Sequence, residues 1–353
     1  MWPADLSAVT PASGAGCLKY FPPLRAQFSA GQIATPGVSQ KLDHYWQQFS
    51  RTDLTGRDGV RFCLYSKTTL PAWRKPSAAL LLVPGRIEAA HKYAELAQDA
   101  LCSGYQVFVL DHRGQGLAQR PEPDPQLGDV ADFQLYVDDL TLALSHIRSQ
   151  TDLPMLALAH SMGGAILYRY LQTTTLPMLD AAVFSAPMFG IPLGPVPAAA
   201  TLLARLMHQL NKRCSKHGWF VPGQTRYQPK PFEGNDLTNS AERYQWFRQL
   251  YQQYPAYQLG GVSWAWLDAA LRACSQVRQG QRPALPMLML QAGADTVVAN
   301  SAQNSVAQQH GILLQQIAGA KHELLAGTDA EREQVFQLIN GWLAQHGATG
   351  PGE

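Results

Sequence analysis

Ala159-His160-Ser161-Met162-Gly163 stands between a short apolar run, 154–158, and a segment of helical periodicity, 165–171, and this junction decides the fold. A strand that turns sharply into a helix leaves no room for a large side chain two residues before or after a central serine. Both residues at those positions are small. The pattern therefore predicts a nucleophile elbow that lifts the Ser161 hydroxyl above a sheet edge, whereas the competing interpretation is a serine in an ordinary tight turn.

An acid and a histidine follow two later apolar runs. Leu285–Gln291 has the continuous apolar character of a buried parallel strand, and Asp295 lies in the loop behind it. Ile312–Ile317 is a second short run, followed by His322. Taken singly, the acid could cap a helix and the histidine could be a surface residue. Because nucleophile, acid and histidine stand in this order at the ends of predicted strands, we predict a catalytic triad with Ser161.

Two neighbouring residues compete for roles in this triad. Glu323 directly follows His322 and is an alternative acid, but adjacent side chains in a loop usually diverge, so Asp295 is preferred. His160 directly precedes the nucleophile, and we expect its side chain on the opposite side of the turn. His322 is therefore the predicted base.

Attack by a serine also needs backbone donors for the negative charge that develops on the substrate oxygen. The amide of Met162, the residue after the nucleophile, is one candidate. The run Ala78–Val83 predicts another buried strand, and Pro84–Glu88 forms the loop behind it. Gly85 in that loop allows a turn that directs the Arg86 amide inward, so Arg86 is the second predicted donor.

Apolar runs alternate with helical periodicities along most of the chain and predict a mostly parallel α/β sheet flanked by helices. The predicted strands are 59–67, 78–83, 106–110, 154–158, 181–185, 286–291 and 312–317. Between the predicted strands 181–185 and 286–291 the alternation of strands and helices stops. Helical stretches rich in aromatic residues occur there and predict an inserted cap. The predicted organisation is an aperiodic N-terminal arm at 1–45, a first core segment at 46–188, a helical cap at 189–282, a second core segment at 283–347 and a C-terminal tail at 348–353.

Four short stretches of the sequence resemble those of a known protein family. They are Pro84–Ala97, Asp111–Gly116, His160–Gly164 and Gly319–Glu323. Together they resemble the monoacylglycerol-lipase-like branch of the α/β-hydrolases. The segments Asn235–Tyr244 and Gly260–Trp266, outside the predicted triad, are most similar to those of bacterial lysophospholipases.

The resemblance covers about residues 43 to 345 and implies an α/β-hydrolase fold with hydrolysis of carboxylic esters in lipids with a single acyl chain. Lysophospholipase activity is the expected function. A monoacylglycerol lipase or esterase and an aminopeptidase on the same fold are the alternatives, and a binding protein without chemistry is a third. The expected substrate is a lysophospholipid or a monoacylglycerol.

Composition limits the setting and the cofactors. The 353 residues have a net charge of +2 and contain five scattered cysteines without a C-x-x-C pair, so we expect a reducing, cytoplasmic compartment. The first 30 residues lack the basic start and apolar core of a secretory signal. Gly114-Gln115-Gly116 lacks the third glycine of a dinucleotide-binding turn, and no metal-ligand spacing is present, so we expect neither a cofactor nor a metal.

The predicted cap carries a basic stretch. Residues 181–232 contain no acidic side chain and six basic ones. We expect a head-group or membrane-facing surface there, and the alternative is a solvated helix face balanced by acids nearby. The candidate head-group residues are Lys212, Arg213, Lys216, Trp219 and Trp266. Peripheral association with the inner membrane is the partner hypothesis, nucleic acid is not expected, and the sequence indicates no oligomeric state.

Overall fold

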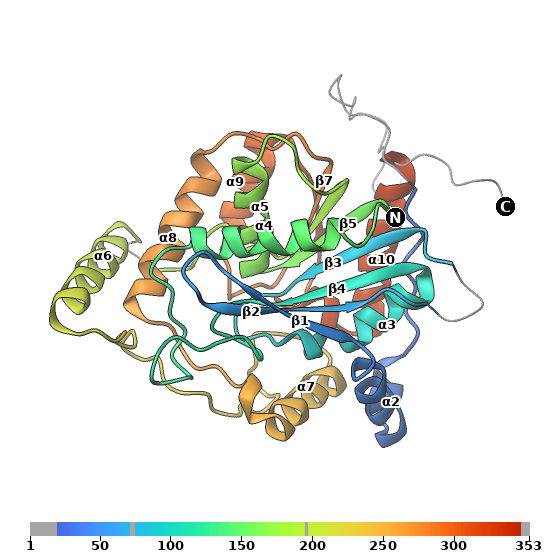
Figure 1. Cartoon of the computed structure of the whole chain (residues 1–353), viewed down its shortest axis with the longest axis horizontal. Helices are drawn as coiled ribbons and strands as arrows, with labels where there is room; N and C mark the ends of the chain where they lie inside the picture. Colours follow the sequence, from blue (N-terminus) through green and yellow to red (C-terminus); the bar gives the residue numbers. More distant parts are fainter. Residues whose placement is uncertain (1–19, 71–74, 195–196, 347–353) are drawn as a thin grey trace.

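The computed structural model describes residues 20–70, 75–194 and 197–346, and an eight-stranded sheet forms its centre (Figure 1). The strands are β1 (Ser50–Thr55), β2 (Arg61–Lys67), β3 (Ala78–Val83), β4 (Tyr105–Asp111), β5 (Met155–His160), β6 (Ala181–Ser185), β7 (Met287–Ala292) and β8 (Leu313–Ile317). Their order across the sheet is β1-β2-β4-β3-β5-β6-β7-β8. β2 pairs antiparallel with β1 and β4, and all other neighbours are parallel. The predicted mostly parallel α/β sheet is confirmed.

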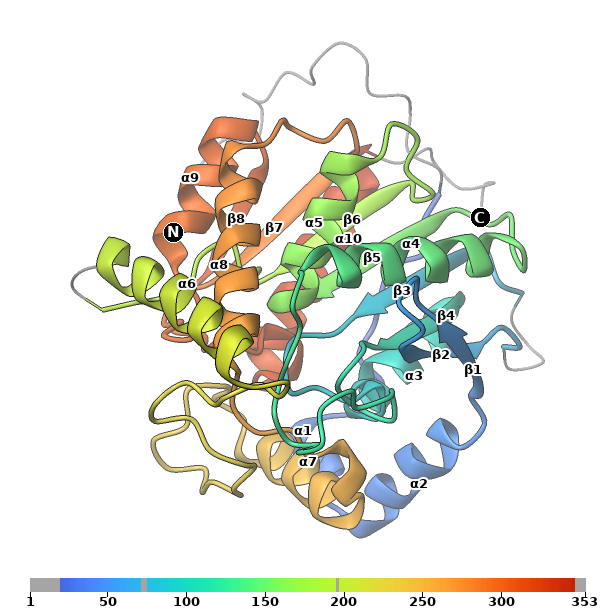
Figure 2. The ribbon, with the colours of Figure 1, turned by 60° about the vertical axis from the view of Figure 1, so that its left-hand side comes forward.

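Helices cover both faces of this sheet. The helices of the described residues are α1 (Ala30–Ile33), α2 (Pro36–Trp46), α3 (Ala94–Ser103), α4 (Gln134–Arg148), α5 (Met162–Thr173), α6 (Pro197–Cys214), α7 (Ala241–Gln253), α8 (Trp264–Gln279), α9 (Asn300–His310) and α10 (Asp329–His346), with short 3-10 turns η2 (Ala90–Tyr93), η3 (Pro255–Tyr257) and η4 (Leu324–Ala326). α4, α5, α8 and α9 lie on one face, and α3 and α10 lie on the other (Figures 1 and 2).

The central strands form because their sequences are apolar without interruption. Every residue of β3, β5, β6 and β7 is buried. A parallel strand covered by helices on both faces requires such a sequence. In the register, Val83 is opposite Ala159 and His160 is opposite Ser185. The loops that follow β3, β5 and β6 therefore leave the same edge of the sheet side by side.

Strand β1 was not predicted from the sequence. Its residues Ser50–Thr55 are largely polar and alternate between exposed and half-buried positions. The strand exists because it pairs antiparallel with β2 along its whole length, from Ser50 opposite Ser66 to Thr55 opposite Arg61. An edge strand with little apolar surface leaves a weak sequence signal.

The described part of the predicted N-terminal arm, residues 20–45, forms helix α1 and most of helix α2, and several of its apolar side chains are buried in the core. Leu24, Ile33 and Leu42 are buried in the core. Ser29 starts α1 with a capping box to Gln32. The aperiodic sequence of this segment predicted neither these helices nor their burial. The first 19 residues of that arm, and the predicted tail at 348–353, lie outside the described residues.

The predicted cap contains α6, α7 and α8. Helices α6 and α7 lie outside the sheet and its covering layers in both views (Figures 1 and 2). Helix α8 packs against α6 but also against α5 and α9 of the covering layer. The boundaries between core and cap stay a prediction. In the structure, α6, α7 and the loop that connects them are the part of this segment that lies apart from the core.

Candidate active site

Ser161 occupies the turn between β5 and α5 in a conformation that few residues adopt. Its φ is 52° and its ψ is −117°. A Cβ at Gly163 would lie 2.2 Å from the Val83 carbonyl oxygen and 2.4 Å from the Pro84 carbonyl oxygen, so only glycine fits there. Ala159 is fully buried before the turn. The small residues of the motif thus allow the sharp strand-to-helix turn, and the positive φ at the serine is the strain associated with it.

Three side chains from three separate loops form a hydrogen-bonded chain at this turn. His322 Nε2 lies 2.9 Å from Ser161 Oγ, and His322 Nδ1 lies 2.7 Å from Asp295 Oδ2. An ionised carboxylate only accepts hydrogen bonds, so these contacts assign the proton to Nδ1 and leave Nε2 to accept from the serine hydroxyl. The geometry is that which a serine nucleophile and a histidine base require.

Asp295 is held as an ionised acceptor. Its Oδ1 accepts hydrogen bonds from the amides of Val297 and Val298, at 2.8 and 3.1 Å. Burial raises the pKa of Asp295, but the hydrogen bond from His322 and these amides outweigh burial and lower the pKa below its usual value. The carboxylate therefore stays charged and fixes the orientation of the imidazole.

The two predicted oxyanion donors lie on adjacent loops. Met162 is the first residue of α5, and Arg86 follows Gly85 in the loop after β3. A Cβ at Gly85 would lie 3.1 Å from Ser161 Cβ, so this loop runs directly against the nucleophile. Within the described part of the chain, neither the Arg86 nor the Met162 amide donates a hydrogen bond to another group. Both amides are available to a substrate oxygen.

Comparison with known proteins agrees with this arrangement. Residues 74–329 match the family Hydrolase_4, described as "Serine aminopeptidase, S33". The chain belongs to this family. It is 32% identical to Lysophospholipase L2 of Escherichia coli (strain K12), over 86% of this chain and 90% of the relative. It is 26% identical to human monoglyceride lipase, over 84% of this chain and 91% of the relative.

A solved structure of the same fold belongs to a soluble variant of monoglyceride lipase from Saccharomyces cerevisiae, in complex with a substrate analog. The TM-score is 0.64 with 18% sequence identity, over 86% of this chain and 95% of that one. The predicted α/β-hydrolase fold is thereby confirmed.

The side chain of His160 does not lie where the sequence predicted it in this α/β-hydrolase. Its ring centroid lies 4.7 Å from that of His322, and its Nδ1 lies 3.1 Å from the Ser185 carbonyl oxygen. The prediction that it points away from the triad is wrong. His160 is the last residue of β5, and its side chain leaves the strand on the side where the loop that carries His322 lies. Burial lowers the pKa of His160, so the ring is neutral beside the triad at physiological pH.

Glu323 does not contact His322 in place of Asp295. Its Oε1 accepts a hydrogen bond from Lys92 Nζ at 2.6 Å, and the same ammonium donates to Glu88 Oε1 at 2.8 Å. Glu88 Oε2 in turn accepts from the Gly85 amide at 2.5 Å. This ion cluster of Glu88, Lys92 and Glu323 was not identified from the sequence. The spacing of Glu88 and Lys92 was a visible signal, because residues four apart meet on one side of a helical turn.

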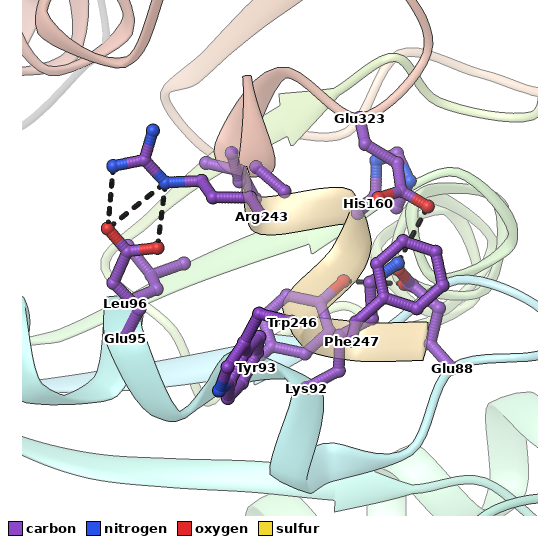
Figure 3. A pocket seen from close by; sticks show the side chains of 12 residues that line it. Glu88, Lys92, Tyr93, Glu95, Leu96, His160, Arg243, Trp246, Phe247 and Glu323 are labelled. Atoms are coloured by element: carbon purple, nitrogen blue, oxygen red, sulfur yellow. Dashed lines mark hydrogen bonds and ion pairs between the residues drawn. The ribbon is translucent and has the colours of Figure 1, made fainter. Parts of the chain in front are cut away.

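The ion cluster lines a pocket together with His160, whose ring packs against that of His322 (Figure 3). His160 and Glu323 line one side of the pocket, while Trp246 and Phe247 of α7 cover it from the cap. Lys92 Nζ lies 4.4 Å from the centre of the Phe247 ring. The cap residues thus contact the core through the same cluster that holds the loops after β3 and β8.

The candidate head-group residues are not all near the triad. Lys212 and Arg213 are in the last turn of α6 and, like Lys216, are exposed. Trp219 is half-buried, and its carbonyl oxygen accepts from the Trp264 amide. Trp266 is buried, with the Arg86 guanidinium 5.4 Å from its ring centre. Of the five residues, Trp266 therefore lies beside the loop that contacts Ser161.

Two further observations concern the described residues only. None of their helices combines the length and the hydropathy that a membrane crossing requires. Within the same residues, no group of three or more His, Cys, Asp or Glu side chains could hold a metal ion.

Proposed function

We propose that this protein is a serine hydrolase that releases the fatty acid from lysophospholipids. One observation carries the proposal: the hydrogen-bonded set of Ser161, His322 and Asp295 lies in a chain that matches a lysophospholipase over 90% of that relative's length. Ester hydrolysis on lipids with one acyl chain is the chemistry shared by the names of the relatives quoted above.

In the first step, Ser161 Oγ attacks the ester carbonyl carbon while His322 Nε2 takes the hydroxyl proton. Asp295 stabilises the imidazolium that forms, and the amides of Arg86 and Met162 donate to the oxyanion. Collapse of this intermediate breaks the bond to the glycerol oxygen, which leaves with the proton from His322. The acyl group stays on the serine.

In the second step, a water molecule attacks the acyl-enzyme while His322 again takes a proton. The fatty acid leaves, and Ser161 recovers its hydrogen from the imidazolium.

The family description makes an aminopeptidase the alternative to test. Such an enzyme needs free carboxylates near the triad to bind the substrate ammonium. Two of the cap acids already have partners: Asp268 pairs with His208 at 3.0 Å, and Asp236 accepts from Thr296 Oγ1 at 3.0 Å. These contacts support the lipid esterase over the aminopeptidase.

The test compares the wild-type protein with Ser161→Ala. A fluorophosphonate probe should label the wild type and not the variant, because the probe reacts with an activated serine. Fatty-acid release from lysophosphatidylethanolamine should exceed release from monoacylglycerol and from aminoacyl amides, and should fall by several orders of magnitude in the variant. Preferential cleavage of aminoacyl amides would establish the aminopeptidase, and absence of labelling would indicate a binding protein.

We also propose that α6 binds the cytoplasmic face of an anionic membrane. Four leucines of this helix are unusually exposed: Leu202, Leu203, Leu206 and Leu210, at 58, 51, 57 and 46%. Their spacing places them together along the helix. The exposed basic side chains Lys212, Arg213 and Lys216 follow at its C-terminal end. An apolar stripe beside basic residues suits the interface of an anionic bilayer.

Vesicle sedimentation tests this surface. We expect binding to phosphatidylglycerol vesicles, with little binding to phosphatidylcholine vesicles. Substituting Leu202, Leu206 and Leu210 by Gln, or Lys212, Arg213 and Lys216 by Glu, should each weaken binding at least tenfold, since each basic side chain is worth about 1 kcal/mol at such a surface. Leu176→Gln is the control, because Leu176 is 84% exposed outside α6. Unchanged binding in both sets would overturn the proposal.

A further inference from the structure

The side chain of Arg86 lies between the loop after β3 and the cap. Its Nη1 donates to the Gly260 carbonyl oxygen at 3.0 Å, and its guanidinium carbon lies 5.4 Å from the centre of the Trp266 ring. The preceding residue, Gly85, runs against Ser161. A cationic group thus extends from the very loop that faces the nucleophile.

This guanidinium has no acidic partner in the described part of the chain. The most buried arginines, Arg113, Arg243 and Arg332, each form ion pairs, for example Arg113 with Asp139 at 2.7 Å. Arg86 makes one hydrogen bond, to a carbonyl oxygen. Asp268, which follows Trp266 by two residues in the chain, pairs with His208 and Arg272 instead.

An unpaired cation in such surroundings is costly. Burial lowers the pKa of Arg86 to about 10, so the group stays protonated at neutral pH but loses much of its hydration. A guanidinium binds phosphate through parallel N–H donors, and this pairing is strongest where water is excluded. Most donors of Arg86 are not used by the protein, so the site favours an anionic group on the ligand.

We propose that Arg86 binds the phosphate of the lysophospholipid and so selects phospholipids over neutral glycerides. The inference rests on the proposed function. The scissile ester and the phosphate are attached to the same glycerol, so the phosphate must lie close to the carbonyl that Ser161 attacks. An arginine in the loop that touches Ser161 meets this requirement. Its backbone amide faces the oxyanion, and its side chain provides specificity.

A purely structural role for Arg86 predicts a different result. The contacts with Gly260 and Trp266 could serve only to fasten the cap, and losing them would then slow every substrate equally. Phosphate recognition affects only substrates that carry a phosphate. Comparing lysophosphatidylethanolamine with a monoacylglycerol of the same acyl chain separates the two roles.

The experiment measures kcat/KM of Arg86→Gln and Arg86→Lys on both lipids in the same detergent micelles. We expect the ratio of kcat/KM for the lysophospholipid to kcat/KM for the monoacylglycerol to fall about tenfold to a hundredfold in Arg86→Gln, and by less in Arg86→Lys. Fluorophosphonate labelling of both variants checks that they fold and retain an activated Ser161. Equal losses on both lipids would overturn the inference.

Arg120→Gln is the matched control. Arg120 also joins the core to the cap through carbonyl oxygens, donating to Gly116 at 3.1 Å and to Ala256 at 2.9 Å. It should leave the ratio of the two kcat/KM values unchanged. If the wild type is labelled by the probe but hydrolyses neither lipid, the proposed function fails and this inference fails with it. A normal lysophospholipid preference in Arg86→Gln would refute the inference alone.

Discussion

At the scale of single residues, the site depends on which acid meets His322. Asp295 and Glu323 were both candidates, and Asp295 is the one in contact, with its second oxygen held by two amides. Glu323 is engaged by Lys92 instead. The orienting acid is therefore both ionised and rigidly held, as a base that must keep one tautomer requires.

Asp295→Asn tests this role. The amide can hold the imidazole in place only in the other tautomer, so we expect kcat to fall by about 10⁴-fold with a small change in KM. Steady-state hydrolysis of a lysophospholipid measures both constants. Asp236→Asn, a neighbouring surface carboxyl that binds Thr296, should retain activity within about twofold. Comparable losses in the two variants would remove Asp295 from the triad.

Asp111 predicts a dependence of stability on pH. Burial raises its pKa to about 6, although the amides of Leu117 and Ala90 and the Tyr65 hydroxyl donate to it. Since the folded pKa lies above the unfolded value of 3.8, this carboxyl stabilises the fold fully below the unfolded pKa and loses that contribution as the pH rises through about 6.

The cost of Asp111→Asn should therefore decrease with pH. Relative to wild type, the loss in free energy of unfolding should be about 2 kcal/mol smaller at pH 7.5 than at pH 4.5, measured by urea denaturation. Asp53→Asn is the control, because its hydrogen bond from Arg51 lowers the pKa of Asp53. That effect is complete above pH 4.5, so its cost should stay constant. A cost of Asp111→Asn that grows with pH would contradict the assignment.

At the scale of elements, the ion cluster joins the loop that contacts Ser161 to the loop that carries His322. Glu88 binds the Gly85 amide in the loop after β3, and Glu323 directly follows His322 in the loop after β8. Lys92 bridges the two carboxylates. Burial raises the pKa of Glu88, but the Lys92 ammonium outweighs burial and lowers that pKa to about 2. The loop after β3 and the loop after β8 are thus held together by this pair of ion pairs.

Lys92→Met should break this link. The lysine side chain is 8% exposed and its partners 6 and 7%, so two carboxylates would remain buried without a cation. We expect a loss of about 3–5 kcal/mol in free energy of unfolding, together with a lower kcat. Chemical denaturation and steady-state kinetics provide the two readouts. Lys41→Met, an exposed lysine on α2, should change stability by less than about 0.5 kcal/mol. A loss of that size in Lys92→Met would show that the cluster is dispensable.

At the scale of the whole molecule, the two ends of the described chain are fastened together. The Asn340 side chain on α10 donates to the Leu24 carbonyl oxygen and accepts from the Leu24 amide, both at 2.8 Å. The Gln27 amide donates to Asp99 on α3 at 2.7 Å. The N-terminal segment therefore packs across α3 and α10, the two helices that cover one face of the sheet.

Asn340→Ala should weaken the attachment of residues 20–46 to α10. Both backbone groups of the buried Leu24 lose their partner, which costs about 1–3 kcal/mol in free energy of unfolding. Protease cleavage within residues 20–46 should accelerate before the core unfolds, and mass spectrometry of the fragments locates the cut. Gln337→Ala, an exposed position on the same helix, is the control. Identical cleavage rates in both variants would show that other contacts hold the segment.

Much of the fold could be predicted because buried parallel strands need continuous apolar sequence. Seven of the eight strands follow that pattern or its alternating form, and only the polar edge strand β1 escaped it. The short α1 was missed although Ser29 and Gln32 form its capping box. A helix of four residues is about one turn long, which is too short to show a helical periodicity in the sequence.

The sequence by itself determined the sharp turn at Ser161, the seven apolar or alternating strands and the order in which Ser161, Asp295 and His322 follow them, because these depend on neighbours along the chain. Only the tertiary structure decided which polar atoms meet. It placed His160 beside His322, engaged Glu323 with Lys92 and, among the residues the structure describes, left the Arg86 guanidinium without an acid. The physical reason is that hydrogen bonds and ion pairs act over a few ångströms between segments far apart in the chain, and only packing brings such segments together.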